Sequence, residues 1–137
     1  MIRALIFLAI LISAVSGCSV SSDTTAAEQA VSKFHEQLDA GRFDEIYAGS
    51  SADLKKITSQ QIMAALLADL HRRLGTTKSS KEQTWHVNFN SSGNLVTLKY
   101  KTVYAASEVD EEFAYRMQDN VPSLAGYHFD ISAPVAK

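Results

Sequence analysis

The hydrophobic positions of this chain follow a helical period in its first half and a strand period in its second. Between residues 25 and 74, apolar side chains recur every three or four residues, which is the spacing of an amphipathic helix. From residue 82 onward they alternate with polar side chains, which is the period of a half-buried strand. The pattern predicts helices first and an antiparallel sheet afterwards, an α+β arrangement with the helices on one face of the sheet.

The first helix is predicted to run from Thr25 to Gly41. Thr25 and Glu28 form a capping box, in which each side chain accepts a hydrogen bond from the other residue's backbone N–H. Gly41 ends the helix because the position after a helix C-terminus favours a positive φ. A short helical segment is expected over residues 42–48. The apolar stripe of the first helix comprises Ala27, Ala30, Val31, Phe34 and Leu38.

The strongest helical pattern comes next, after a short segment capped by Ser51. It opens with a second capping box, from Thr58 to Gln61, and Gly75 ends it. Residues 76–81 are polar and are predicted to form a loop. The apolar stripe of this helix comprises Ile62, Leu66, Leu67, Leu70 and Leu74.

Four strands are predicted after residue 82. Residues 91–94 are typical of a turn, and residues 119–122 are expected to form a loop. Short connections favour pairing between sequence neighbours, and so a meander. The apolar face of the sheet is predicted to comprise Trp85, Val87 and Phe89, then Val96, Leu98, Tyr100, Thr102 and Tyr104, then Phe113, Tyr115 and Met117, and finally Ala125, Tyr127, Phe129 and Ile131.

The start of the chain has a different character. Arg3 precedes an apolar run over residues 4–15, which is too short to cross a bilayer but suits the core of a signal peptide. Residues 15–18, Val-Ser-Gly-Cys, resemble the lipobox of bacterial lipoproteins. That resemblance implies cleavage before Cys18 and attachment of a lipid to its sulfur atom. Two or more acyl chains anchor a protein stably.

These observations divide the chain into four parts. Residues 1–17 are predicted to be a lipoprotein signal peptide, and residues 18–24 the lipidated Cys and a flexible tether. Residues 25–133 form a single α+β domain, and residues 134–137 a tail. The predicted location is the bacterial cell envelope, facing the periplasm if the cell is Gram-negative. The outer membrane is favoured because Ser19 is not the Asp that marks retention at the inner membrane.

Composition narrows the function classes. The formal net charge of −2 lacks the excess of basic residues that is typical of nucleic-acid-binding domains. Cys18 is the single cysteine, so neither an internal disulfide nor a cysteine-based metal site is expected. We expect no cofactor and no metal, because no phosphate-binding loop or metal-ligand spacing is present.

Residues 26–132 resemble small bacterial domains of unknown function with the nuclear-transport-factor-2-like, or cystatin-like, fold. The resemblance rests on the opening helix with residues 38–47, Leu-Asp-Ala-Gly-Arg-Phe-Asp-Glu-Ile-Tyr, on residues 53–56 and on the Leu-Gly pair at 74–75. Residues 124–127, Leu-Ala-Gly-Tyr, resemble the final strand of that group, although Pro122 replaces its usual Trp. The resemblance implies a cone-shaped pocket between the helices and a curved four-stranded sheet, without implying an activity.

No catalytic constellation is visible, so the catalytic candidates rest on single residues and one strand face. His128 and Asp130 share one face of a strand, where they could act as an acid–base pair with Tyr47 as a hydroxyl donor. His35 lies off the apolar stripe of its helix and is predicted to be solvated. Residues 110–112 are acidic and are interpreted as a solubilising edge that prevents aggregation.

Aromatic and apolar residues near the open end of a cone would line its pocket. The pocket-lining candidates are Phe34, Tyr47, Leu66, Trp85, Tyr100, Tyr104, Phe113, Tyr115, Tyr127 and Phe129.

Three functions compete. The leading hypothesis is a lipid-anchored, non-catalytic envelope protein that binds a small apolar molecule or an envelope protein through its pocket or sheet face. The first alternative is a small enzyme of the isomerase or dehydratase type, with a pocket acid or base. The second is a structural homodimer, formed through the sheet face that carries Thr97, Lys99, Arg116 and His128.

Overall fold

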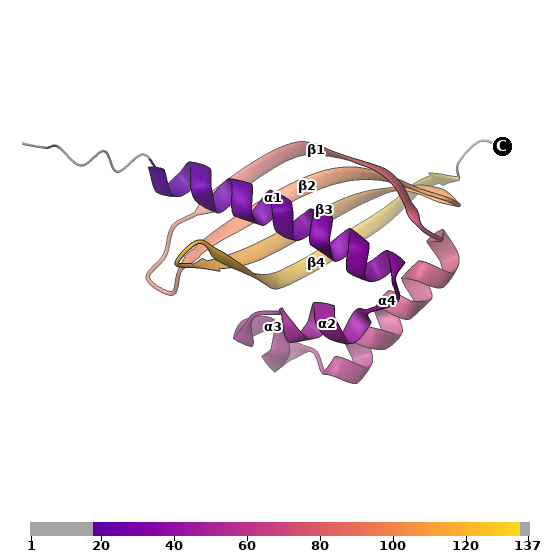
Figure 1. Cartoon of the computed structure of the whole chain (residues 1–137), viewed down its shortest axis with the longest axis horizontal. Coiled ribbons are helices and arrows are strands. Elements are labelled where there is room, and N and C mark those ends of the chain that lie inside the picture. The colour runs from indigo at the N-terminus through magenta and orange to yellow at the C-terminus, as the bar shows by residue number, and fades with distance from the viewer. Residues whose placement is uncertain (1–17, 135–137) are drawn as a thin grey trace, which may run out of the picture.

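The computed structural model describes residues 18–134, with side chains from residue 20 to residue 132. The predicted signal peptide and the last three residues lie outside the described part. Within it, four helices precede four strands (Figure 1), which confirms the α+β prediction. The elements are α1 (Cys18–Asp39), α2 (Phe43–Ala48), α3 (Ala52–Ile57), α4 (Gln60–Leu74), β1 (Thr77–Asn88), β2 (Asn94–Tyr104), β3 (Ser107–Gln118) and β4 (Val121–Pro134).

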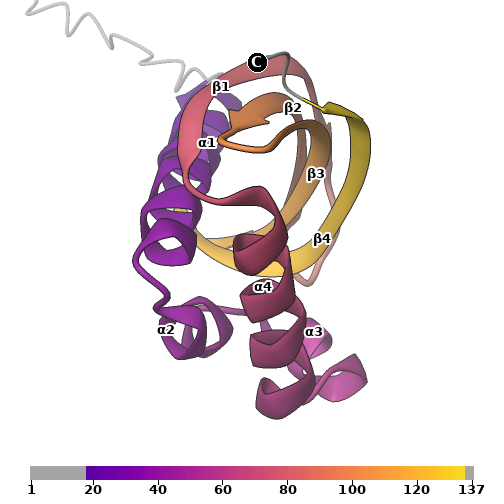
Figure 2. The same cartoon turned by 90° about the vertical axis from the view of Figure 1, so that its right-hand side faces the viewer.

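The strands form one antiparallel sheet in the order β1-β2-β3-β4, which is the predicted meander. The sheet bends strongly, and Figure 2 shows its strands curling into a half-barrel. In Figure 1, α1 crosses the sheet on its concave side, and α2, α3 and α4 lie together below α1 in this view.

The core fills the space between α1 and the concave face of the sheet. The predicted stripe of α1 is buried there, as the apolar periodicity required. The alternating positions of β2 and β3 supply the other side, so the predicted faces of these two strands are confirmed. The core residues that line the sheet are Val96, Leu98, Tyr104, Val109, Phe113, Tyr115, Met117 and Leu124.

The segment predicted to be a flexible tether forms the first turns of α1 instead. Thr25 is therefore an interior helical residue and not a cap. Residues 18–24 are helical because of tertiary contacts that the local sequence does not reveal. Asp23 accepts a hydrogen bond from Asn94 Nδ2 at 2.9 Å, and the Ser22 hydroxyl donates to Asn120 Oδ1 at 2.7 Å. These contacts to the β1–β2 and β3–β4 hairpins outweigh the modest helix propensity of the segment's serines and threonines.

Helix α4 is the strongest predicted helix, but its buried face is turned from the expected one. Ser59, and not Thr58, is its N-cap, and the Ser59 hydroxyl accepts a hydrogen bond from the Ile62 N–H. Ile62 and Leu66 are exposed, because α4 packs mainly against α2 and so covers only a narrow stripe. That stripe comprises Met63, Leu67, Leu70 and Leu74.

Strand β1 begins at Thr77, inside the stretch predicted to be a loop. Asp39, at the end of α1, accepts hydrogen bonds from the Thr77 N–H at 2.9 Å and from its hydroxyl at 3.1 Å. The polar residues 78–81 suit β1 because it is an edge strand with much of its surface in solvent. Phe89 lies just beyond the end of β1 and not on its inner face.

Strand β4 also begins earlier than predicted, at Val121, and it includes Pro122. Asp119 and Asn120 both adopt positive φ and form the tight turn from β3. An irregularity in the β3–β4 register between Gly126 and Leu124 shifts the alternation. Leu124 is therefore the buried residue, in place of the predicted Ala125.

Candidate functional site

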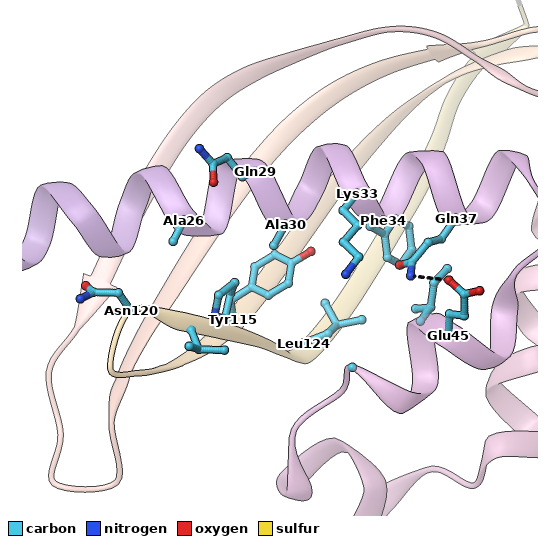
Figure 3. Close-up of a pocket in the computed structure, with 14 residues that line it drawn as sticks. Ala26, Gln29, Ala30, Lys33, Phe34, Gln37, Glu45, Tyr115, Asn120 and Leu124 are labelled. Atoms are coloured by element: carbon cyan, nitrogen blue, oxygen red, sulfur yellow. Dashed lines mark hydrogen bonds between the residues drawn. The ribbon is translucent and has the colours of Figure 1, made fainter.

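A pocket of about 410 Å³ lies between α1, α2 and the β3–β4 hairpin (Figure 3). α1 contributes residues spaced three or four apart, so one face of the helix forms a wall of the pocket. The opposite wall comes from the start of β4, which the tight turn at residues 119–120 folds back beneath α1. The apolar lining comprises Ala26, Ala30, Phe34, Ile46, Val121, Pro122 and Leu124.

Polar groups gather on one side of this pocket. Figure 3 shows Lys33 reaching from α1 into the space above Leu124. Among the described residues no carboxylate lies within ion-pair distance of Lys33. The nearby Glu45 on α2 is already engaged, because it accepts hydrogen bonds from Gln37 and from Arg42, each at 3.2 Å. The ammonium of Lys33 is therefore the charge available to a molecule in the pocket.

Tyr115 supplies a second polar group to the pocket. It lies on β3 and is 4% exposed, and its hydroxyl makes no hydrogen bond within the described residues. Burial raises the pKa of Tyr115, and the neighbouring Tyr100 and Glu111 raise it further. The phenol is thus a neutral hydrogen-bond donor at ordinary pH. Lys33 and Tyr115 together offer a cation and a donor beside apolar walls, an arrangement that fits an amphiphilic anion.

A second group of polar residues lies deeper, within the core. Glu111 on β3 is 2% exposed and shares the inner face with Phe113. His35 Nε2 donates to Glu111 Oε2 at 2.8 Å. The hydroxyls of Tyr104 and Tyr127 both donate to Glu111 Oε1, at 2.8 and 2.6 Å. These four residues, which we call the Glu111 cluster, satisfy one another as buried polar groups must.

The surroundings of the Glu111 cluster act on its pKa values in opposite directions. Burial alone would raise the pKa of Glu111. The hydrogen bond and electrostatic attraction from His35, with smaller contributions from Thr102 and Tyr127, outweigh burial and lower it. Burial raises the pKa of Tyr104 and of Tyr127, and the charge of Glu111 raises both further. The cluster is therefore a carboxylate held by neutral phenols.

Phe34 lies between the pocket and the Glu111 cluster. Its ring lines the pocket and also contacts the rings of Tyr127, Phe113 and His35, with centroids 4.7, 5.1 and 5.9 Å away. No member of the Glu111 cluster lines the pocket. The two sites are therefore neighbours separated by one aromatic side chain.

The predicted pocket residues fall into three groups. Phe34 and Tyr115 do line the pocket. Leu66 lies exposed on α4, and Trp85 borders a separate hollow beside the start of α1. The remaining residues belong to the core or its margin, and comprise Tyr47, Tyr100, Tyr104, Phe113, Tyr127 and Phe129.

The structure brings together two of the three predicted catalytic residues, because His128 and Asp130 share one face of β4 as predicted while Tyr47 lies elsewhere. His128 and Asp130 are exposed on β4, opposite Glu112 and Asp110 of β3. The Tyr47 hydroxyl instead donates to the carbonyl of Thr58 at 3.1 Å, on the side of the helices.

Two predictions about charged residues were wrong, because both side chains point inward. His35 is buried and not solvated, and Glu111 is buried and not part of a solubilising edge. Glu111 has the same strand parity as Phe113 and Tyr115, and this signal was available in the sequence. His35 lies four residues after Val31 and three before Leu38, so it borders the stripe of α1.

Two kinds of feature are absent from residues 18–134. No group of three or more His, Cys, Asp or Glu side chains is arranged to hold a metal ion. No helix in this range is long and apolar enough to cross a bilayer.

The fold resembles that of a solved structure from Streptomyces avermitilis, a proposed dehydratase from the NTF2-like (nuclear-transport-factor-2-like) family. The two structures align with a TM-score of 0.57 at 11% sequence identity, over 82% of this chain and 97% of the other. At this identity the likeness shows the fold alone, and it confirms the predicted NTF2-like fold. No model of a protein family and no curated protein matches the sequence.

Proposed function

We propose that this chain is a lipid-anchored, non-catalytic protein of the bacterial cell envelope that binds a small amphiphilic anion in the pocket beside α1. One observation carries the proposal: Lys33, without an ion-pair partner in the described structure, reaches into a pocket with apolar walls. A carboxylate, sulfonate or phosphate group would pair with Lys33, and an apolar body would cover Phe34 and Leu124. The hydroxyl of Tyr115 would supply a further hydrogen bond.

The anchor and the location rest on the start of the sequence. The short apolar run and the Val-Ser-Gly-Cys sequence support cleavage before Cys18 and lipidation of its sulfur. The absence of Asp at position 19 supports the outer membrane over the inner membrane. An envelope protein is the alternative partner for the pocket or the sheet face.

Binding can be tested with anilinonaphthalene sulfonate, a fluorescent probe that joins apolar rings to an anion. The probe should bind the folded protein, and Lys33→Gln should weaken that binding about tenfold, the loss of one hydrogen bond to a charged group. Lys78→Gln is the matched control, since Lys78 is exposed on β1 and outside the pocket. Equal binding by the two variants would contradict the proposal. Separately, native mass spectrometry of protein purified from cells would reveal a resident ligand.

A second candidate function, an isomerase or dehydratase, is favoured by the Glu111 cluster. A buried carboxylate beside an imidazole can transfer protons, and phenols can stabilise an oxyanion. The structural neighbour from Streptomyces avermitilis is itself a proposed dehydratase. However, both carboxylate oxygens of Glu111 are already engaged, and Phe34 separates them from the pocket.

The enzyme hypothesis requires turnover that depends on Glu111. Purified protein would be incubated with β-hydroxycarbonyl compounds, and the appearance of conjugated products followed by ultraviolet absorbance. Activity that disappears in Glu111→Gln, with an unchanged circular dichroism spectrum, would favour an enzyme over a binding protein. Activity that survives in this variant would not come from this cluster.

A further inference from the structure

Three large apolar side chains remain exposed at the end of the molecule where α1 begins. Trp85 is 50% exposed, Phe89 61% and Val121 65%. Trp85 lies in a hollow formed with Val20 and Thr24 of α1. Phe89 follows β1 in the β1–β2 hairpin, and Val121 opens β4 after the β3–β4 turn. Figure 1 shows both hairpin turns at the left of the view, at the same end as the start of α1.

Hydrogen bonds fix these parts to one another. Asp23 joins the first turns of α1 to Asn94 in the β1–β2 hairpin, and Ser22 joins them to Asn120 in the β3–β4 turn. The three exposed side chains therefore belong to a surface of defined shape, and not to independent loops. We call this surface the proximal face, defined by Trp85, Phe89 and Val121.

We infer that the proximal face docks on the lipid bilayer to which the chain is anchored. This inference rests on the proposed lipidation of Cys18. Because Cys18 is the first residue of α1, with no tether between lipid and domain, the acyl chains and the proximal face are held at the same end. A domain anchored in this way must rest on the membrane with that end.

The chemistry of the proximal face suits the membrane interface. An indole ring favours the headgroup region, where its apolar body and its N–H group are both accommodated. Exposed Phe and Val side chains add apolar area that lipid can cover. Charged residues of both signs lie near the proximal face: Glu28 borders the hollow at Trp85, Asp119 lies in the β3–β4 turn, and Arg116 donates a hydrogen bond to the Gly93 carbonyl. The attraction therefore comes from apolar contact and does not require anionic lipid.

Trp85 is the single tryptophan of the chain, so its fluorescence reports on this face directly. The lipidated full chain would be reconstituted in phosphatidylcholine vesicles that contain brominated acyl chains, which quench tryptophan on contact. The emission of Trp85 should shift to shorter wavelength and be quenched. Phe89→Ser should reduce the quenching several-fold, and circular dichroism would check that this variant is folded.

The matched control moves the tryptophan to another exposed apolar site. Trp85→Phe combined with Leu66→Trp places the fluorophore on α4, which Figure 1 shows away from the proximal face. Its emission should be unquenched by the same vesicles. Equal quenching at the two positions would overturn the docking, because the domain would then have no preferred orientation on the membrane.

Three further outcomes would also decide the question. The intact mass of protein purified from membranes first shows whether Cys18 is lipidated. An unmodified Cys18 would overturn the anchor and the docking together, whereas binding in the Lys33 pocket would be unaffected. A lipidated chain with unquenched Trp85 would overturn the docking alone. A concentration-dependent blue shift of Trp85 in Cys18→Ser without vesicles would identify the proximal face as a contact between two copies and overturn the membrane assignment.

Discussion

The Glu111 cluster and the Lys33 pocket lie on opposite sides of Phe34 and differ in how their charged side chains are partnered. In the cluster, both oxygens of Glu111 accept hydrogen bonds from three surrounding side chains. In the pocket, Lys33 has no ionic partner in the described structure and faces open space. A buried charge is costly to leave without its partners, whereas an exposed charge without an ion-pair partner beside a cavity is available to a ligand. The ring of Phe34 separates the Glu111 cluster from the Lys33 pocket.

The largest expected effect is on stability, from Glu111→Ala. His35, Tyr104 and Tyr127 would lose their common acceptor inside the core, which we expect to cost about 3–5 kcal/mol of unfolding free energy. The matched control is Glu112→Ala, because Glu112 faces outward and pairs with the half-exposed Lys99 at 3.3 Å. That surface pair should contribute about 0–1 kcal/mol. Urea unfolding of both variants measures the difference, and similar losses would refute a special role for the cluster.

Phe34→Ala should remove the barrier between the two sites. The buried ring contacts the core on one side, so its loss should cost about 3–5 kcal/mol. Water would also reach Tyr127, whose pKa burial raises, so that pKa should fall toward the ordinary value for tyrosine. Ultraviolet titration of the phenols would follow the change. An unchanged titration curve in a folded variant would mean that Phe34 does not shield the cluster.

The cluster also predicts how stability depends on pH. The folded pKa of Glu111 lies below its ordinary value, despite burial, because of the interaction with His35. Its contribution is therefore complete above the unfolded pKa of about 4.3 and is lost as the pH falls through the lower, folded value. Acid should destabilise the wild type in this window, and Glu111→Gln should show a shallower slope below about pH 5. Parallel slopes in urea melts at a series of pH values would contradict the shift.

The smallest expected change in stability is that of Lys33→Gln. Because Lys33 is exposed and unpaired in the described structure, we expect an effect within about 0.5 kcal/mol. Loss of probe binding without loss of stability would complete the contrast with Glu111→Ala. A marked loss of stability would show that Lys33 supports the fold, and the pocket would then lose its leading ligand contact.

Local pattern predicted the fold better than the site. The stripe of α1 and the inner faces of β2 and β3 followed from period alone, because burial on one side imposes that period. The sequence also places Glu111 on the inner face, but its charge favoured the wrong interpretation. Its partners lie 76 residues away in His35 and 16 away in Tyr127, and no local rule brings them together.

The prediction of a flexible tether at the start of α1 was wrong for the same reason. Serine and threonine are weak helix formers, so residues 18–24 indicated a flexible segment. The hydrogen bonds that hold it involve Asn94 at the start of β2 and Asn120 in the β3–β4 turn, both much later in the chain. The register irregularity that buries Leu124 also depends on pairing with β3, which the sequence of β4 does not specify by itself.

The contacts of α1 have a consequence for the order of folding. During synthesis α1 is made before every element that completes it, and its partners at Asn94, Glu111 and Asn120 follow 71 to 98 residues later. The meander can pair strand by strand through short connections, whereas α1 must close these long loops. Its apolar stripe is therefore only partly covered until the β3–β4 hairpin exists. We expect α1 to dock last, and a nascent chain that stops before β4 to need a chaperone to stay soluble.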